Sequence, residues 1–251
     1  MAVILVTNDD GAGAEGLKTL EEILKGLAHV VVVAPDQERS AVSHALTLHS
    51  SISYQAIGSD RYILNGTPAD CVIFALRHLF AQPPDMVISG INHGANLGDD
   101  IMYSGTVAAA REASRHGIPA MAISQAYYDG RPIHFKEGAP YVRDLIAAML
   151  RNNLNGEICL NVNIPVGNIR GIKITRQGCE EHIPHFNALD YKLDYDDLPF
   201  ARAVAIKSEL MSDRQAIREQ YISITPLQRD LTDYSTARIL MGEADRFFSL
   251  R

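Results

Sequence analysis

Two adjacent carboxylates, Asp9 and Asp10, are the residues of this chain best placed to do chemistry. They follow Val3–Val6, a mostly β-branched run typical of a strand buried on both faces of a parallel sheet. In open α/β sheets, ligands bind at the carboxyl ends of the strands. Paired carboxylates there are costly unless a cation neutralises them, and carboxylate oxygens select Mg²⁺, Mn²⁺ or Ca²⁺. The alternative interpretation is an Asp-Asp-Gly turn in which one Asp caps the next helix.

A second polar cluster follows the strand predicted over 85–90, and it combines amides, glycines, carboxylates and hydroxyls. It ends in Ser104-Gly105-Thr106, which leads into a helix predicted over 107–116. The N–H groups and positive dipole at such a helix start suit a phosphate. We therefore take Asn96, Ser104 and Thr106 as candidates for holding phosphate oxygens. Plain N-capping by Ser104 or Thr106 is the alternative, but it leaves the preceding density of polar residues unexplained.

A third group lies in the loop over 36–48, after a strand predicted over 29–35. Ser40 can give an oxygen to a metal ion, and Arg39 can contact a phosphate. His44 is a candidate acid or base. The alternatives are a solvated loop with Ser40 as a cap and His44 as a surface group.

The elements that must position these groups alternate between strand and helix patterns. The predicted strands are 3–7, 29–35, 85–90, 120–124, 157–164 and 171–176, with a short β excursion within 47–64. The predicted helices are 14–27, 69–80 with Thr67 as N-cap, 107–116 and 140–150. Strands that alternate with helices favour right-handed βαβ units. The fold class is therefore α/β, a Rossmann-like, mostly parallel sheet with helices on both faces.

The C-terminal part of the chain differs in character. Residues 177–212 are polar and show no clear periodicity, and 211–220 is a loop or short helix. A clear strand over 221–227 precedes a helix predicted over 233–240. An isolated strand often pairs in a hairpin arm or with a second subunit. We expect a catalytic core over 1–176 and an extension with an arm over 177–251, which together can also form one domain.

Composition narrows the class of protein. The chain has 251 residues, 47% of them hydrophobic, and a net charge of −7. That charge disfavours a nucleic-acid duplex or an anionic membrane as partner, but a bound cation still allows a phosphorylated small substrate. The three cysteines are widely spaced and predict reduced thiols. With no signal-peptide pattern and no membrane-spanning run, a cytoplasmic location is expected.

Several motifs, in order, resemble the SurE survival-protein nucleotidases. These motifs are T-N-D-D-G at 7–11, V-A-P-D-x-x-R-S at 33–40, N-G-T-P-A-D-C-V at 65–72, S-G-I-N-x-G-x-N-L-G-D-D at 89–100, Y-S-G-T-V-A-A-A at 103–110 and Y-I-S-I-T-P-L-x-x-D-L-T at 221–232. The resemblance implies a metal-dependent phosphatase that hydrolyses nucleoside monophosphates, a 5′- or 3′-nucleotidase, with some reach to short polyphosphates. It also implies a homodimer or homotetramer that exchanges C-terminal arms.

The resemblance further implies one divalent ion per subunit, Mg²⁺ or Mn²⁺, held by the residues that match the family's ligands. Those residues are Asp9, Asp10, Ser40 and Asn92. The chain departs from the family pattern at four places: Ala41 and Gln220 replace usual glycines, His44 stands where Asn is familiar, and 177–212 lacks an expected aromatic segment.

For the reaction we expect direct attack by water, with Asp9, Asn96, Ser104 and Thr106 as catalytic groups and the general acid unassigned. A covalent phosphoryl-Asp9 is an alternative, although the phosphatases that use one have D-x-D spacing. A nucleotide or phosphate sensor without turnover and a metal-dependent hydrolase of other substrates also stay open. A dehydrogenase is disfavoured, because the first turn lacks G-x-G-x-x-G and its carboxylates would repel a pyrophosphate.

Overall fold

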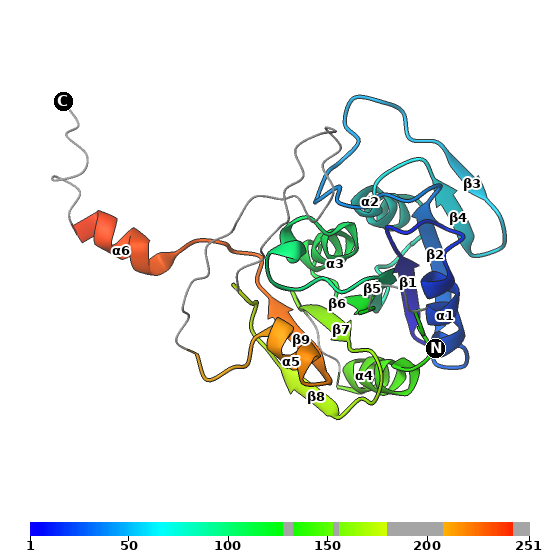
Figure 1. The fold of residues 1–251 in the computed structure, drawn as a ribbon. Coiled ribbons are helices and arrows are strands. Elements are labelled where there is room, and N and C mark those ends of the chain that lie inside the picture. The colour runs from blue at the N-terminus through cyan, green and yellow to red at the C-terminus, as the bar shows by residue number, and fades with distance from the viewer. Residues whose placement is uncertain (128–132, 153–155, 180–207, 243–251) are drawn as a thin grey trace, which may run out of the picture.

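The computed structural model describes residues 1–127, 133–152, 156–179 and 208–242. Within these residues the strands form one sheet in the order β3-β4-β2-β1-β5-β6-β7-β9-β8 (Figure 1). The strands from β4 to β7 along this order are all parallel, while β3 and β9 are antiparallel to their neighbours β4 and β7. The Rossmann-like α/β class predicted from the sequence is confirmed.

The strands are β1 (Val3–Thr7), β2 (His29–Pro35), β3 (Tyr54–Ala56), β4 (Arg61–Leu64), β5 (Met86–His93), β6 (Ala120–Gln125), β7 (Cys159–Ile164), β8 (Gly171–Ile174) and β9 (Tyr221–Leu227). The helices are α1 (Glu15–Leu24), α2 (Pro68–His78), α3 (Gly105–Arg115), α4 (Ala139–Arg151), α5 (Asp213–Arg218) and α6 (Tyr234–Gly242), with a 3₁₀ turn η1 (Gly98–Met102).

Helices cover both faces of the sheet. Alternate side chains of β1 point to opposite faces, so Ile4 and Val6 pack with α1 and α4, whereas Leu5 packs with α2 and α3. Burial on both faces explains why the strand is apolar throughout. Gly16 of α1 lies so close to β5 that a Cβ there would stand 1.9 Å from the Ile91 carbonyl oxygen. This contact fixes α1 against the strand that leads into the second polar cluster.

Two elements differ from the sequence prediction in a way that matters for the site. Strand β5 extends to His93, beyond the predicted end at Gly90, and contains a bulge: Ser89 pairs with Ala122 but Asn92 with Ser124. The prediction that the strand over 221–227 pairs in an arm or with a second subunit is wrong, because β9 lies within the main sheet between β7 and β8. Its alternating Ile222 and Ile224 are needed in the core beside α4.

Candidate functional site

Asp9 is held at the carboxyl end of β1 by the first turn of α3. Its Oδ2 accepts a hydrogen bond from the Thr106 N–H at 3.0 Å, and its Oδ1 accepts one from the Thr106 hydroxyl. Both residues are buried. Thr106 therefore fixes the carboxylate in one orientation, and the positive end of the helix dipole faces the negative charge.

This approach of helix and strand depends on a glycine. A Cβ at position 105 would lie 2.9 Å from Asp9 Oδ2 and 3.1 Å from Pro68 of α2. The hydroxyl of Ser104 accepts the Val107 N–H at 3.1 Å, so Ser104 is the N-cap of α3 and also lines the pocket described below. The capping interpretation of Ser104 is therefore confirmed, and its role in a phosphate site stays a prediction.

Asn92 lies at the bulge in β5, and Asp10, just after β1, contacts the residue that follows Asn92. The Asn92 amide Nδ2 donates to the Gly94 carbonyl oxygen at 2.8 Å. This bond does not use the Asn92 amide oxygen. Asp10 Oδ2 accepts the His93 N–H at 3.0 Å. Bulges next to active sites re-aim a side chain. Here the bulge carries Asn92 to the same strand edge as the two carboxylates.

The loop with Ser40 is tied to the same edge through its backbone. The Arg39 N–H donates to the Asp9 carbonyl oxygen at 2.7 Å, so Ser40 follows directly after a contact with β1. Ser40 is exposed, and its hydroxyl donates to Glu38 at 2.7 Å. Ala41, which replaces a familiar glycine, keeps a left-handed backbone with φ of 54°. Gln220 does the same with φ of 66°.

Two predicted phosphate-binding residues have other partners in the structure. Thr106 uses both its N–H and its hydroxyl on Asp9, so it positions that carboxylate, and it is not among the residues that line the cavity described below. Asn96 donates its side-chain N–H to Ser124 at 2.8 Å, and its backbone N–H binds Asn163 of β7 at 2.7 Å. Buried polar groups take protein partners where they can, and a phosphate-binding role for these two residues stays a prediction.

A cavity of about 310 Å³ collects the remaining groups. Its lining residues come from the three polar clusters and are Asp9, Ser40, Ala41, Asn92, His93, Gly94, Ala95, Asn96, Asp100, Tyr103, Ser104 and Tyr127. Asp10 is adjacent in sequence but does not line it. The lining combines polar side chains such as Asp9 and Asn92 with the rings of His93, Tyr103 and Tyr127.

The aromatic side of the cavity did not emerge from sequence reasoning. The rings of His93 and Tyr127 lie 5.0 Å apart and are tilted by 42°. Tyr103 and Tyr127 are 42% and 46% exposed, a large fraction for tyrosines that line a polar cavity. In the sequence, His93 lies at the end of β5, Tyr127 lies just after the end of β6, and Tyr103 lies between η1 and α3. Such faces offer a stacking surface to a flat ring.

A second missed feature is the support that α5 gives to the loop over 94–100. Asp213 is fully buried and accepts the Gly98 N–H at 2.9 Å. Arg214 donates to the Leu97 carbonyl oxygen at 3.1 Å and to Asp100 at 3.2 Å. These residues lie in the stretch that the sequence left as loop or short helix. The role of Asp213 and Arg214 could not be predicted from the sequence, because their partners at 97–100 are far away along the chain.

Comparison with known proteins places the chain in a family. The family model described as "Survival protein SurE" matches residues 4–183. The chain belongs to the SurE family. The protein named 5′-nucleotidase SurE from Syntrophotalea carbinolica is 40% identical over 242 residues, covering 95% of this chain and 96% of that protein. The protein of the same name from Dichelobacter nodosus is 43% identical over 234 residues, covering 91% and 93%.

A solved structure agrees with this assignment. The crystal structure of the SurE protein from Aquifex aeolicus matches this SurE-family chain with a TM-score of 0.79 and 37% identity. The match covers 97% of this chain and all of that one. The family resemblance and the fold predicted from the sequence are therefore confirmed.

The groups at the Asp9 end fit a hard divalent cation. Burial, together with the smaller effect of the neighbouring Asp10 charge, raises the pKa of Asp9 from 3.8 to about 6 despite the Thr106 hydrogen bonds. Burial also raises the pKa of Asp10. No cluster of three or more His, Cys, Asp or Glu side chains suited to a metal occurs in the described part of this SurE-family chain. An ion at this edge would thus combine two carboxylates with neutral oxygens, as Mg²⁺ and Mn²⁺ accept.

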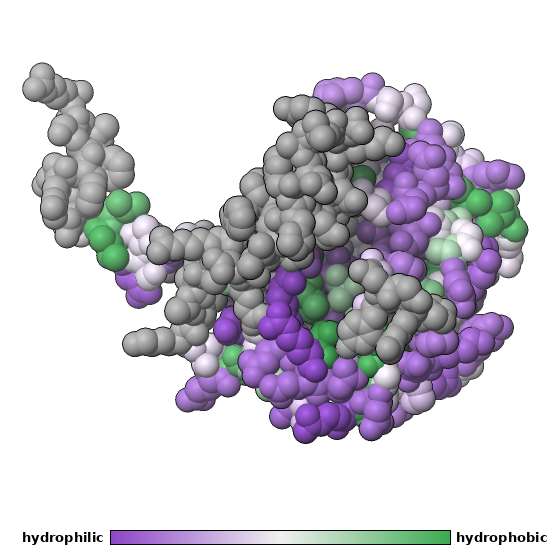
Figure 2. All heavy atoms as spheres, in the orientation of Figure 1, coloured by the Kyte–Doolittle hydropathy of each residue, from purple (hydrophilic) through white to green (hydrophobic). Residues whose placement is uncertain are grey.

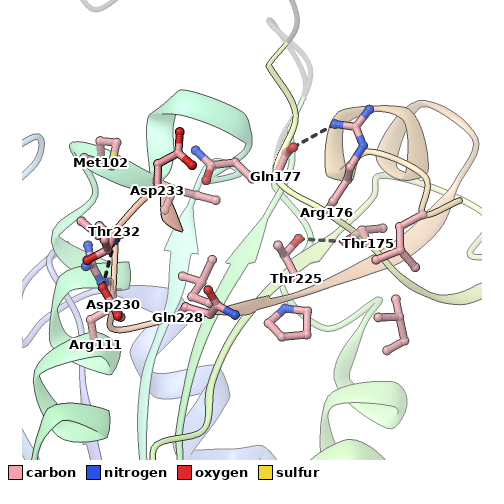
Figure 3. A pocket seen from close by; sticks show the side chains of 16 residues that line it. Met102, Arg111, Thr175, Arg176, Gln177, Thr225, Gln228, Asp230, Thr232 and Asp233 are labelled. Atoms are coloured by element: carbon pink, nitrogen blue, oxygen red, sulfur yellow. Dashed lines mark hydrogen bonds between the residues drawn. The ribbon is translucent and has the colours of Figure 1, made fainter. Parts of the chain in front are cut away.

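A larger cavity of about 560 Å³ lies apart from these groups (Figure 3). It is bounded by η1 and α3 on one side and by the chain that leaves β9 on the other, and its labelled side chains include Met102, Arg111 and Asp233. None of the predicted site residues lines it. We therefore assign the chemistry to the smaller cavity at Asp9.

Three further predictions concern the cysteines, membrane-spanning segments and the cellular location. All three cysteines are free, and two of them are buried, as expected for reduced thiols. Among the described residues, no helix is long and apolar enough to span a membrane. The cytoplasmic location stays a prediction.

Proposed function

We propose that this chain is a metal-dependent phosphomonoesterase that hydrolyses nucleoside monophosphates to nucleoside and phosphate. Membership of the SurE family makes it a hydrolase of the nucleotidase class, in line with the name that its relatives carry. The observation that carries the proposal is Asp9: a buried carboxylate clamped by Thr106 at a helix N-terminus, facing a cavity with Ser40 and Asn92. A buried charge of this kind calls for a counter-charge.

The residues that would hold a single Mg²⁺ or Mn²⁺ ion are Asp9, Asp10, Ser40 and Asn92. When bound, the ion supplies Lewis-acid polarisation of the phosphate and a more acidic water. Thr106 keeps the Asp9 carboxylate oriented, so no reorganisation is needed when charge develops.

Phosphate oxygens would be held at the start of α3. Ser104 lines the cavity there, and the helix N-terminus adds its positive dipole end. Asn96 lines the cavity too, although its side-chain N–H is bonded to Ser124. We propose that Asn96 acts chiefly by shaping this wall. Hydrolysis of short polyphosphates would use the same groups.

The nucleoside would occupy the aromatic side of the cavity. Tyr103 and Tyr127 line the same cavity as Ser104 and are 42% and 46% exposed, and the Tyr127 ring lies 5.0 Å from the ring of His93. A base can stack on such rings whatever its identity, because every base has a π face. This arrangement supports a broad choice of base.

We further propose a homodimer or homotetramer that exchanges the C-terminal arm. Helix α6 stands away from the sheet, and it buries none of its residues within the chain (Figure 1). Its Ile239 and Met241 are 60% and 79% exposed, and apolar atoms are visible on this helix in Figure 2. A helix with apolar residues exposed in this way needs a partner surface. Light scattering on the intact chain and on an Ile239→Asp, Met241→Asp variant tests this, and an oligomer unaffected by both changes contradicts it.

The decisive experiment is phosphate release from a panel of 5′- and 3′-nucleoside monophosphates and short polyphosphates. The protein is assayed with EDTA and then with Mg²⁺ or Mn²⁺ added back. Release that stops with EDTA and returns with metal supports the proposal. If folded protein releases no phosphate with either metal, a sensor that binds nucleotide without turnover becomes the better account, and thermal shift with nucleotides is the next measurement.

Two variants test the residues directly. Asp9→Asn and Asn92→Ala should abolish turnover while the circular dichroism spectrum stays unchanged. Asp85→Asn is a matched control, since that carboxylate binds the Val3 N–H at the opposite end of β1. Undiminished turnover in purified Asp9→Asn would refute the assignment.

A further inference from the structure

Helix α3 carries a buried carboxylate that the proposed reaction does not use. The Glu112 side chain is 2% exposed and has one arginine and two histidines as neighbours. His44 Nε2 lies 2.9 Å from its Oε2, Arg115 Nη2 2.6 Å from its Oε1, and His116 Nε2 3.0 Å from its Oε1. A buried carboxylate with this many partners is a fixed anchor point.

The three neighbours of Glu112 differ in where they come from. Arg115 and His116 lie at the C-terminal end of α3 itself, three and four residues along from Glu112. His44 comes from the loop over 36–48, 68 residues away in sequence. Only the His44 contact therefore links the loop to α3.

That loop carries Ser40, one of the proposed metal ligands, and its backbone is unfavourable. Ala41 and Ser43 both adopt left-handed conformations, with φ of 54° and 53°. This conformation is strained for a residue other than glycine, so surrounding contacts must hold the loop in this shape. The Arg39 N–H donates to the Asp9 carbonyl oxygen just after β1, and the Ser43 N–H donates to the Tyr103 carbonyl oxygen just after η1 at 2.9 Å.

The far end of the loop is tied to the start of α2, where the Thr47 N–H donates to Asp70 at 3.2 Å and the Thr67 hydroxyl donates to the Ala45 carbonyl oxygen at 2.8 Å. The His44 contact with α3 lies between these ties.

Helix α3 also holds a second proposed metal ligand, Asp9. Thr106 in its first turn donates twice to Asp9. Glu112 lies on the same rigid helix, less than two turns further on. A contact between the loop and Glu112 therefore fixes the loop relative to the helix that orients Asp9.

We propose that His44 is a positioning residue: through its hydrogen bond to Glu112 it fastens the Ser40 loop to α3, and so sets the separation between Ser40 and Asp9. The effect on metal binding rests on the proposed function, whereas the fastening of the loop does not. The hydrogen-bonding capacity of the side chain at position 44 is what matters. The familiar family residue there is also polar.

The test uses three variants of the full-length protein. His44→Phe keeps a ring of similar size but removes the hydrogen bond. His44→Gln restores a donor, since a Gln Nε2 can reach the place of the His Nε2. His116→Phe removes an equivalent hydrogen bond to the same carboxylate without touching the loop, so it is a matched control.

The first readout is amide hydrogen exchange over residues 39–47 in EDTA, which needs neither metal nor activity. We expect about tenfold faster exchange in His44→Phe, and wild-type rates in His44→Gln and His116→Phe. The second is Mn²⁺ affinity by electron paramagnetic resonance, where His44→Phe should lose about tenfold, as for other residues that orient metal ligands. kcat/KM should fall by a similar factor, with KM for the nucleotide little changed.

The outcomes separate the two proposals. Wild-type exchange in His44→Phe, equal effects of His44→Phe and His116→Phe, or no recovery in His44→Gln would each overturn the role of His44. If the wild-type protein neither binds Mn²⁺ nor releases phosphate, the proposed function fails, yet the exchange data still decide whether His44 fastens the loop.

Discussion

Replacing Asp9 with Asn should make the metal-free protein more stable at neutral pH, although the same change should abolish turnover. In the folded chain the Asp9 carboxylate is buried beside Asp10, and burial raises its pKa from 3.8 to about 6. An Asn can keep both bonds to Thr106, because its oxygen accepts the Thr106 N–H and its amide donates to the Thr106 hydroxyl. The charge is then removed without leaving a polar group unpaired.

The magnitude follows from linkage between proton binding and folding. A pKa raised from 3.8 to about 6 corresponds to about 3 kcal/mol, at about 1.4 kcal/mol per pH unit. Because the folded state binds the proton more tightly, wild-type stability falls as pH rises from 3.8 to about 6, and the full cost is present above that window. Solvent entry at the cavity reduces this figure, so we expect Asp9→Asn to be more stable by about 1–3 kcal/mol at pH 8.

The assay is urea unfolding in EDTA at pH 8 and pH 4, followed by far-UV circular dichroism because the chain has no tryptophan. The gain should be present at pH 8 and should largely vanish at pH 4. Asp144→Asn, which removes an exposed carboxylate on α4, is the control and should show no such pH dependence. Equal stability of wild type and Asp9→Asn at pH 8, or a gain that does not depend on pH, would refute the electrostatic account of this site.

Four further changes test other parts of the structure. Gly105→Ala should lower kcat/KM at least tenfold, measured by phosphate release, because its Cβ would stand 2.9 Å from Asp9 Oδ2 and push α3 from β1. Tyr127→Ala should raise KM for nucleoside monophosphates severalfold but leave the rate with inorganic polyphosphate unchanged, because only a nucleotide has a base that stacks on this ring. Equal losses with both substrates would contradict a stacking role for Tyr127. Although burial raises the pKa of Glu112, hydrogen bonds from His44 and Arg115 outweigh it and lower the pKa from 4.5 to about 2. The contribution of Glu112 to the free energy of unfolding is therefore complete above pH 4.5 and lost as pH falls towards 2. Glu112→Gln should remove this part of the dependence of stability on pH, measured by urea unfolding between these values. Gln220→Gly should raise the free energy of unfolding by up to about 1 kcal/mol, because φ of 66° suits glycine, and an unchanged urea midpoint would argue against strain at this turn.

Sequence patterns were sufficient for the parallel core of the fold. Val3–Val6 and the run in β2 are apolar on both faces because helices cover both, and that requirement is visible residue by residue. Thr67 was predicted as N-cap of α2, and its hydroxyl does accept the Asp70 N–H, with the Asp70 carboxylate completing the capping box. Such signals are local, so no tertiary information is needed to see them.

The position of β9 within the sheet could not be predicted from such local sequence signals. Its composition gives a strand, but composition does not say which neighbour it pairs with, and pairing depends on the position of β7 and β8 in space. The division into a core over 1–176 and an extension over 177–251 stays a prediction, although β9 of the extension completes the sheet of the core. Residues 180–207, where the chain departs from its family, lie outside the described residues.

What the sequence determined by itself was the family, the α/β class and the set of polar residues at the carboxyl ends of the strands, because these follow from local composition and motif order. Only the tertiary structure decided which hydrogen-bond partner each of those residues has. Thr106 and Asn96 are hydrogen-bond donors in any sequence reading, but folding commits their N–H and hydroxyl groups to Asp9, Ser124 and Asn163. Partner choice for a buried donor depends on distances between segments far apart in the chain, and those distances exist only in the fold.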